Sequence, residues 1–135
     1  MATYGDNDAI TFQAGEDLRA DIYRLIALDS DGHAILAVDP SVRQMGVLAS
    51  IGASGAQSPS DAIGAHVGIV VSGFWKLICG AAVEAGNLLV PDAQGRAVPA
   101  ADGQFTCCQA LSSTGAAGEH LTCYIRAPSW RVSMS

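Results

Sequence analysis

Turn signals recur along this sequence and divide it into short apolar segments. Two of them have the same form, with Asp first and Gly last: Asp29-Ser30-Asp31-Gly32 and Asp92-Ala93-Gln94-Gly95. The Asp side chain can accept hydrogen bonds from nearby backbone N–H groups, and Gly supplies the positive φ that a tight turn needs. Each turn therefore predicts a β-hairpin. The hairpins join 23–28 to 33–38 and 88–90 to 96–98.

Alternating apolar and polar residues predict further strands. In His120–Arg126 the residues Leu121, Cys123 and Ile125 alternate with polar ones, as in a half-buried strand. We expect Gln104–Leu111 to be its partner, with Phe105, Cys107 and Leu111 on one face. Val67–Val71 and Phe74–Cys79, joined through Ser72-Gly73, predict one long strand that bends at the glycine. Within it we expect Phe74-Trp75 to lie in the core.

Helical signals are sparse. The best lies in Asp17–Leu28, where Leu18, Ile22, Leu25 and Ile26 fall at helical spacing. This segment runs directly into a hairpin turn, which favours a strand at Tyr23–Leu28 and leaves Glu16–Asp21 open. The sequence therefore predicts an all-β protein, a small antiparallel β-barrel or sandwich with hairpins and little helix.

The chain has the length of one domain, with 135 residues of which half are apolar. We expect an N-terminal polar arm at 1–9, a single β-rich domain at 10–126 and a C-terminal tail at 127–135. Within the domain, the Gly- and Ser-rich segment 50–64 predicts an irregular loop that is longer than a hairpin needs.

The charge balance is acidic, with 13 Asp and Glu against 7 Lys and Arg, and the basic residues are scattered. Phosphate backbones require clustered Lys and Arg, so nucleic acid is not an expected partner. The N-terminus lacks the basic flank and apolar run of a signal peptide, and no stretch approaches eighteen consecutive apolar residues. We therefore expect no membrane partner and synthesis in the cytoplasm.

Four cysteines, Cys79, Cys107, Cys108 and Cys123, raise the question of a metal site. Structural zinc sites bring cysteines in pairs two to four residues apart, whereas the only close pair here is adjacent. Adjacent strand residues point to opposite faces. Cys107 and Cys123 instead suit inward positions on neighbouring strands, so we predict core packing and no metal.

No motif predicts catalysis or a cofactor. Asp29-Ser30-Asp31-Gly32 resembles the start of a calcium loop, but the twelfth position is Pro40 where such a loop has Glu. Gly52-Ala53-Ser54-Gly55 lacks the spacing of a nucleophile elbow. No glycine cluster opens a helix to hold phosphate. We therefore expect no enzyme, no catalytic residue and no cofactor.

Several segments, in this order along the chain, resemble the capsid decoration, or cement, proteins of phage heads. The resemblance covers roughly residues 10–126. It departs from the family pattern in the longer loop at 50–64 and in a tail that carries Trp130. The segments that carry it are Ile10-Thr11-Phe12, Gly15-Glu16-Asp17-Leu18, 28–32, Met45-Gly46-Val47-Leu48, 70–74 with Lys76, 82–90 and 92–98.

This resemblance implies a β-rich subunit, a homotrimer, that binds the major capsid protein on the outer surface of the virion and stabilises the head. It carries over no catalytic residue. We expect the arm and the tail to make the capsid or subunit contacts, because Trp and Arg are favoured contact residues. For Trp130, packing onto its own core is the alternative. The expected contact residues are Thr3, Tyr4, Asp6, Trp130 and Arg131.

An alternative from another functional class is a β-sandwich module that binds carbohydrate or a host surface. Such a module needs exposed aromatic side chains gathered on one face. Tyr4, Tyr124 and Trp130 are the candidates, and nothing in the sequence brings them together.

Overall fold

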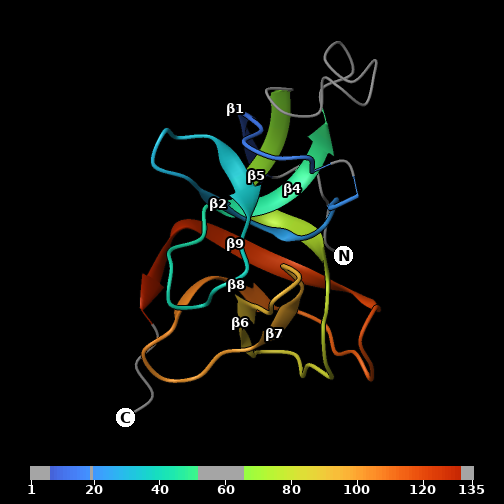
Figure 1. The fold of residues 1–135 in the computed structure, drawn as a ribbon. Helices are drawn as coiled ribbons and strands as arrows, with labels where there is room; N and C mark the ends of the chain where they lie inside the picture. The colour runs from blue at the N-terminus through green and yellow to red at the C-terminus, as the bar shows by residue number, and fades with distance from the viewer. Residues whose placement is uncertain (1–6, 19, 52–65, 132–135) are drawn as a thin grey trace.

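The computed structural model describes residues 7–18, 20–51 and 66–131. These residues form nine strands and no helix, which confirms the predicted all-β fold (Figure 1). None of the described residues belongs to a helix long and apolar enough to cross a membrane. The strands are β1 (Asn7–Gln13), β2 (Leu25–Leu28), β3 (Ala34–Leu36), β4 (Gly46–Ile51), β5 (His66–Ile78), β6 (Leu88–Pro91), β7 (Ala97–Pro99), β8 (Phe105–Ala110) and β9 (His120–Arg131).

All the strand pairs are antiparallel, and they follow the order β3-β2-β4-β5-β9-β8-β6-β7, with β1 paired to β5. Both predicted hairpins are present as β2–β3 and β6–β7. The predicted long strand is β5, in which Gly73 has a φ of 102°. The first part of β5 pairs with β1 and β4, and its second part pairs with β9. β5 thus connects the upper and lower parts of the sheet in Figure 1.

The pairing scheme of the first half of the chain is repeated in the second half. The pairs β1–β5, β2–β3, β2–β4 and β4–β5 correspond in order to β5–β9, β6–β7, β6–β8 and β8–β9. Each half also has one isolated parallel bridge to its hairpin, Ala14 to Ala34 and Cys79 to Ala97. The protein therefore consists of two structurally equivalent halves that share β5.

Backbone hydrogen bonds repeat in the same way. Tyr23 N donates to Leu48 O at 2.9 Å, and Gly86 N donates to Ala110 O at 2.8 Å. These two donors occupy equivalent positions, and both have positive φ, 69° at Tyr23 and 97° at Gly86. The glycines that precede the hairpins are equivalent too, because Gly15 N bonds to Ala34 O and Gly80 N to Ala97 O.

The core consists of two clusters of buried apolar side chains. One includes Leu18, Ile26, Leu48 and Ile69 and lies within the first half. The other contains residues of both halves, among them Leu25, Val70, Leu77, Leu89 and Ile125. All four cysteines belong to this second cluster and are buried free thiols, which confirms the predicted core packing.

The alternation predicted for β8 is wrong at its centre. Thr106, Cys107 and Cys108 are all buried, whereas Leu111 is 43% exposed and does not share the face of Cys107. The reason is a register irregularity between β8 and β9 next to Cys107, which interrupts the two-residue period. Two adjacent cysteines therefore both reach the core.

The ends of the domain also differ from the sequence interpretation. β1 begins at Asn7, so the last three residues of the predicted arm, 7–9, pair with β5. β9 continues through Arg131, so the irregular tail expected from Ala127 is wrong for residues 127–131. Most of the predicted loop at 50–64 lies outside the described residues.

Candidate interaction surface

The predicted contact residues divide into two groups. Thr3, Tyr4 and Asp6 lie outside the described residues. Trp130 and Arg131 belong to β9, where their backbones pair with Thr106 and Phe105. The structure describes only the backbone of these two residues.

The second part of β5 (72–78), together with β9 and β8, presents one face to the core and the other to the outside. Leu77, Leu121 and Ile125 are buried, whereas the intervening Lys76, Tyr124 and Arg126 are exposed. This alternation is the one predicted for 120–126. We call the outward side of these three strands the outer face.

Aromatic side chains lie across the outer face. Phe74 pairs with Tyr124, which pairs in turn with Gln109, so these three residues form a row across β5, β9 and β8. The ring centroids of Phe74 and Tyr124 are 5.5 Å apart, and Tyr124 is 40% exposed. We expected Phe74 and Trp75 to be core residues. Both are only partly buried, and only Trp75 packs against the core cluster.

A second ring contact is centred on Tyr23. Its ring lies 5.4 Å from His120 in an edge-to-face arrangement and 6.2 Å from Trp75. Its carbonyl accepts a hydrogen bond from Ile78 N, next to His120 on the neighbouring strand. Tyr23 thus reaches the His120 end of the outer face.

Tyr23 has an unusual backbone conformation. It is the only non-glycine residue with positive φ in the described part of the chain. A bulky side chain in the left-handed region is strained by roughly 1 to 2 kcal/mol. The equivalent residue of the second half, Gly86, makes the same backbone hydrogen bond without that strain. The fold therefore does not require a tyrosine at this position.

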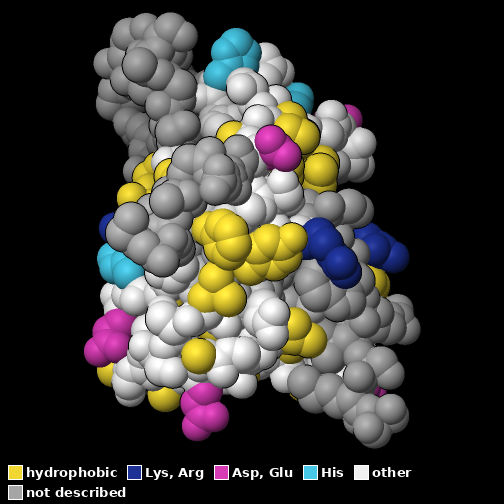
Figure 2. Space-filling view, turned by 180° about the vertical axis from the view of Figure 1, so that it is seen from behind, with side chains coloured by type: hydrophobic (Ala, Val, Ile, Leu, Met, Phe, Trp, Pro, Cys, Tyr) yellow, Lys and Arg dark blue, Asp and Glu magenta, His cyan; other side chains and the backbone are white. Residues whose placement is uncertain are grey.

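The charge on the outer face differs from the charge of the whole chain. The outward positions of β5 and β9 include Lys76 and Arg126, and none of the described outward residues on β5, β9 or β8 is Asp or Glu. The nearby Asp8, on β1, accepts a hydrogen bond from Ser72 at the margin. Figure 2 shows hydrophobic side chains gathered at the centre of one side of the molecule, with basic side chains to their right and an acidic side chain above them.

A second exposed apolar area lies on the connection between β3 and β4. Val38 and Val42 are each 49% exposed and border a shallow hollow with Leu36 and Ala37. Beside it, the Arg43 guanidinium lies 4.6 Å from the centroid of the Phe105 ring. This area has neither a strained residue nor a ring group comparable to that of the outer face.

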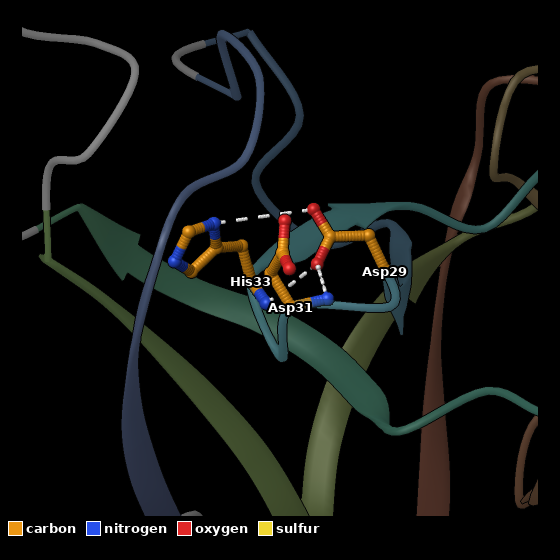
Figure 3. A group of neighbouring side chains, drawn as sticks. All are labelled: Asp29, Asp31 and His33. Carbon is orange, nitrogen blue, oxygen red and sulfur yellow. Dashed lines mark hydrogen bonds and ion pairs between the residues drawn. The ribbon is translucent and has the colours of Figure 1, made fainter.

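Three side chains in the first hairpin come close enough to hold a metal ion, namely Asp29, Asp31 and His33 (Figure 3). Their geometry is explained by the turn. Asp29 Oδ1 accepts hydrogen bonds from the backbone N–H groups of Asp31 and His33, both at 2.9 Å. These bonds, that of His33 first, hold the pKa of the Asp29 carboxyl below its ordinary value. These hydrogen bonds explain why the three side chains lie close together, because they stabilise the turn that the sequence predicted.

In the second hairpin, too, the first Asp of the turn accepts hydrogen bonds from backbone N–H groups, and their contribution to stability can be tested by mutation. Asp92 Oδ1 accepts from Gln94 N at 2.8 Å and from Arg96 N at 2.9 Å, and Asp92 Oδ2 accepts from Arg96 Nε at 3.0 Å. Asp92→Ala leaves these donors unpaired, so we expect the free energy of unfolding to fall by about 1–3 kcal/mol in urea denaturation.

Two controls accompany this prediction. Asp92→Asn keeps Oδ1 and should recover part of the loss. Asp31→Ala, which removes an exposed carboxylate, should change the free energy of unfolding by less than about 0.5 kcal/mol. Equal losses for Asp31→Ala and Asp92→Ala would contradict the role assigned to the first Asp of each turn.

Comparison with known proteins bears on the fold. No model of a known protein family matches the sequence, and no curated protein matches it. Among solved structures, the fold is similar to the N base of head fiber gp8.5 in bacteriophage phi29, with a TM-score of 0.60 and 18% sequence identity. The similarity covers 93% of this chain and 98% of the other. The resemblance to phage head proteins is thus confirmed at the level of the fold.

Proposed function

We propose that this chain is a structural protein of a phage head, a decoration protein that binds the outside of the assembled capsid and stabilises it. The observation that carries the proposal is the end-to-end similarity of its fold to the base of a phage head fiber. The sequence resemblance to capsid decoration proteins points independently to the same class. The partner is the major capsid protein, and the proposed location is the outer surface of a virion assembled in the host cytoplasm.

The proposed mechanism is mechanical. A protein that binds the assembled shell and not its separated subunits stabilises the shell by mass action. A homotrimer would strengthen this effect, because after one subunit binds, the other two face a high effective concentration of sites. The proposal involves no catalytic step, no cofactor, no nucleic acid and no membrane.

The alternative function is binding to carbohydrate or a host surface. The ring pair of Phe74 and Tyr124, in which Tyr124 is 40% exposed, is the observation that favours it, since sugars stack on exposed rings. Of the three aromatics considered from the sequence, only the Tyr124 side chain is described. A glycan array probed with the free protein tests this alternative.

The proposal predicts a change in the heads themselves. Empty, expanded heads assembled without this protein should withstand a higher temperature once it is added, with disruption followed by light scattering. Bovine serum albumin at the same mass concentration controls for crowding. An unchanged disruption temperature at saturating protein would contradict the stabilising role.

A further inference from the structure

We infer that the outer face, centred on Phe74 and Tyr124 and flanked by Lys76 and Arg126, docks this chain onto an acidic protein surface of the capsid. This inference rests on the proposed function and adds the residues and the chemistry of the contact. The sequence indicated the arm and the tail instead, whereas the outer face lies on the central strands of the sheet.

The outer face is held rigidly by its strands. β5, β9 and β8 are the strands with the most extensive pairing in the second half, and the inward apolar residues of β9, of β8 and of the second part of β5 are buried in one core cluster. Phe74 and Tyr124 are held opposite each other by the register of β5 and β9. A rigid aromatic pair loses little conformational entropy on binding, which is why such residues dominate the energetics of protein interfaces.

The strained residue Tyr23 lies beside the His120 end of β9. Gly86 shows that the equivalent turn forms without a side chain, yet Tyr23 keeps a ring there at the expense of backbone strain. The ring meets His120, which lies at the end of the outer face. Strained residues of this kind cluster at functional sites. The Tyr23 ring therefore lies at the His120 end of β5 and β9, where it contacts both His120 and Trp75, the latter packed against the core cluster.

The charge of the outer face is opposite in sign to the net charge of the chain. The chain carries a net charge of −6, yet the described outward positions of β5, β9 and β8 include Lys76 and Arg126 and no carboxylate. An acidic partner surface complements this arrangement. In a two-fold contact of this face with itself, the facing β5, β9 and β8 of the second copy would offer these cations no carboxylate. The charge pattern therefore favours a different, acidic protein.

The experiment is a titration of empty, expanded heads that lack this protein, with bound protein measured by co-sedimentation. Tyr124→Ser and Lys76→Glu should each raise the dissociation constant at least about tenfold, and Tyr124→Phe should retain binding. Val42→Ser is the matched control, because Val42 is at least as exposed but lies away from the outer face, and its dissociation constant should change less than about twofold. Thermal unfolding of each free variant checks that the fold is kept.

The outcomes separate this inference from the proposed function. If the wild-type chain binds heads and both outer-face variants bind equally well, the inference is wrong and the proposed function stands. If the wild-type chain does not bind, both fail. A lower light-scattering mass of free Tyr124→Ser with unchanged head binding would make the face a self-interface. Loss of glycan capture in this variant with unchanged head binding would make it a carbohydrate platform. Either result overturns the inference.

Discussion

Replacing Gly46 with alanine should lower the free energy of unfolding by about 3–5 kcal/mol, because overpacking and a forbidden backbone conformation act together. Gly46 begins β4 with a φ of 154°, and a Cβ there would overlap the carbonyl oxygen of Val70 and lie 2.9 Å from Ile69 Cγ2. Val70 cannot move aside, since β5 is paired at this residue with both β1 and β4. Urea denaturation measures the loss.

Gly103→Ala is the matched control for this prediction. Gly103 also has positive φ, 85°, but a Cβ there would meet nothing within 4 Å. Its replacement should lower the free energy of unfolding by only about 1 kcal/mol, the conformational part alone. If the two variants lose the same stability, close packing of β4 on β5 is not what requires glycine at position 46.

The second large effect is a loss of stability at alkaline pH. A hydrogen bond with the Cys107 sulfur, followed by burial, raises the pKa of the Cys108 thiol well above its ordinary value of 9.0, and burial raises the pKa of the Cys123 thiol. Above pH 9 the unfolded chain releases these protons while the folded protein keeps them. The contribution of these thiols to the free energy of unfolding is therefore complete below the pKa of a thiol in the unfolded chain, and it is lost as the pH rises above that value.

For each of these thiols, the free energy of unfolding should fall by up to about 1.4 kcal/mol per pH unit above pH 9. For both together, the fall between pH 7.5 and pH 10.5 should be about 4 kcal/mol. Urea denaturation at several pH values, with the thiols kept reduced, measures the slope. Cys123→Ala should reduce the slope by about 1.4 kcal/mol per pH unit. An unchanged slope in that variant would show that the alkaline loss comes from other groups.

Much of the fold could be predicted because its turns carry local signals. Asp29 and Gly32, like Asp92 and Gly95, place a carboxylate and a positive φ where the two hairpins need them. The alternation in 120–126 predicted β9 in the same local way. The repetition of the two halves was not evident, because equivalent positions hold residues as different as Tyr23 and Gly86.

Features that depend on contacts between distant segments could not be predicted. The burial of both Cys107 and Cys108 follows from the register irregularity between β8 and β9, for which the sequence of β8 alone has no signal. The strand pairing of residues 127–131 depends on β8 as a partner. Ala127 and Pro128 have no alternating pattern that would have indicated it.

The candidate surface was only partly accessible from the sequence. Tyr124 was expected on the outward side of its strand, and the structure places it there. Its partner Phe74 was assigned to the core, because apolar strand residues are more often buried than exposed. The Tyr23 contact joins a turn to two later strands, so no spacing within the sequence could reveal it.

The central claim is that this protein binds an assembled capsid, and co-sedimentation tests it most directly. Purified wild-type protein is mixed with empty, expanded heads that lack it, and the mass of the free protein is measured by light scattering. We predict saturable binding at a fixed ratio to the major capsid protein, with a trimeric mass in solution. Absence of binding to any form of the head would contradict the proposed function.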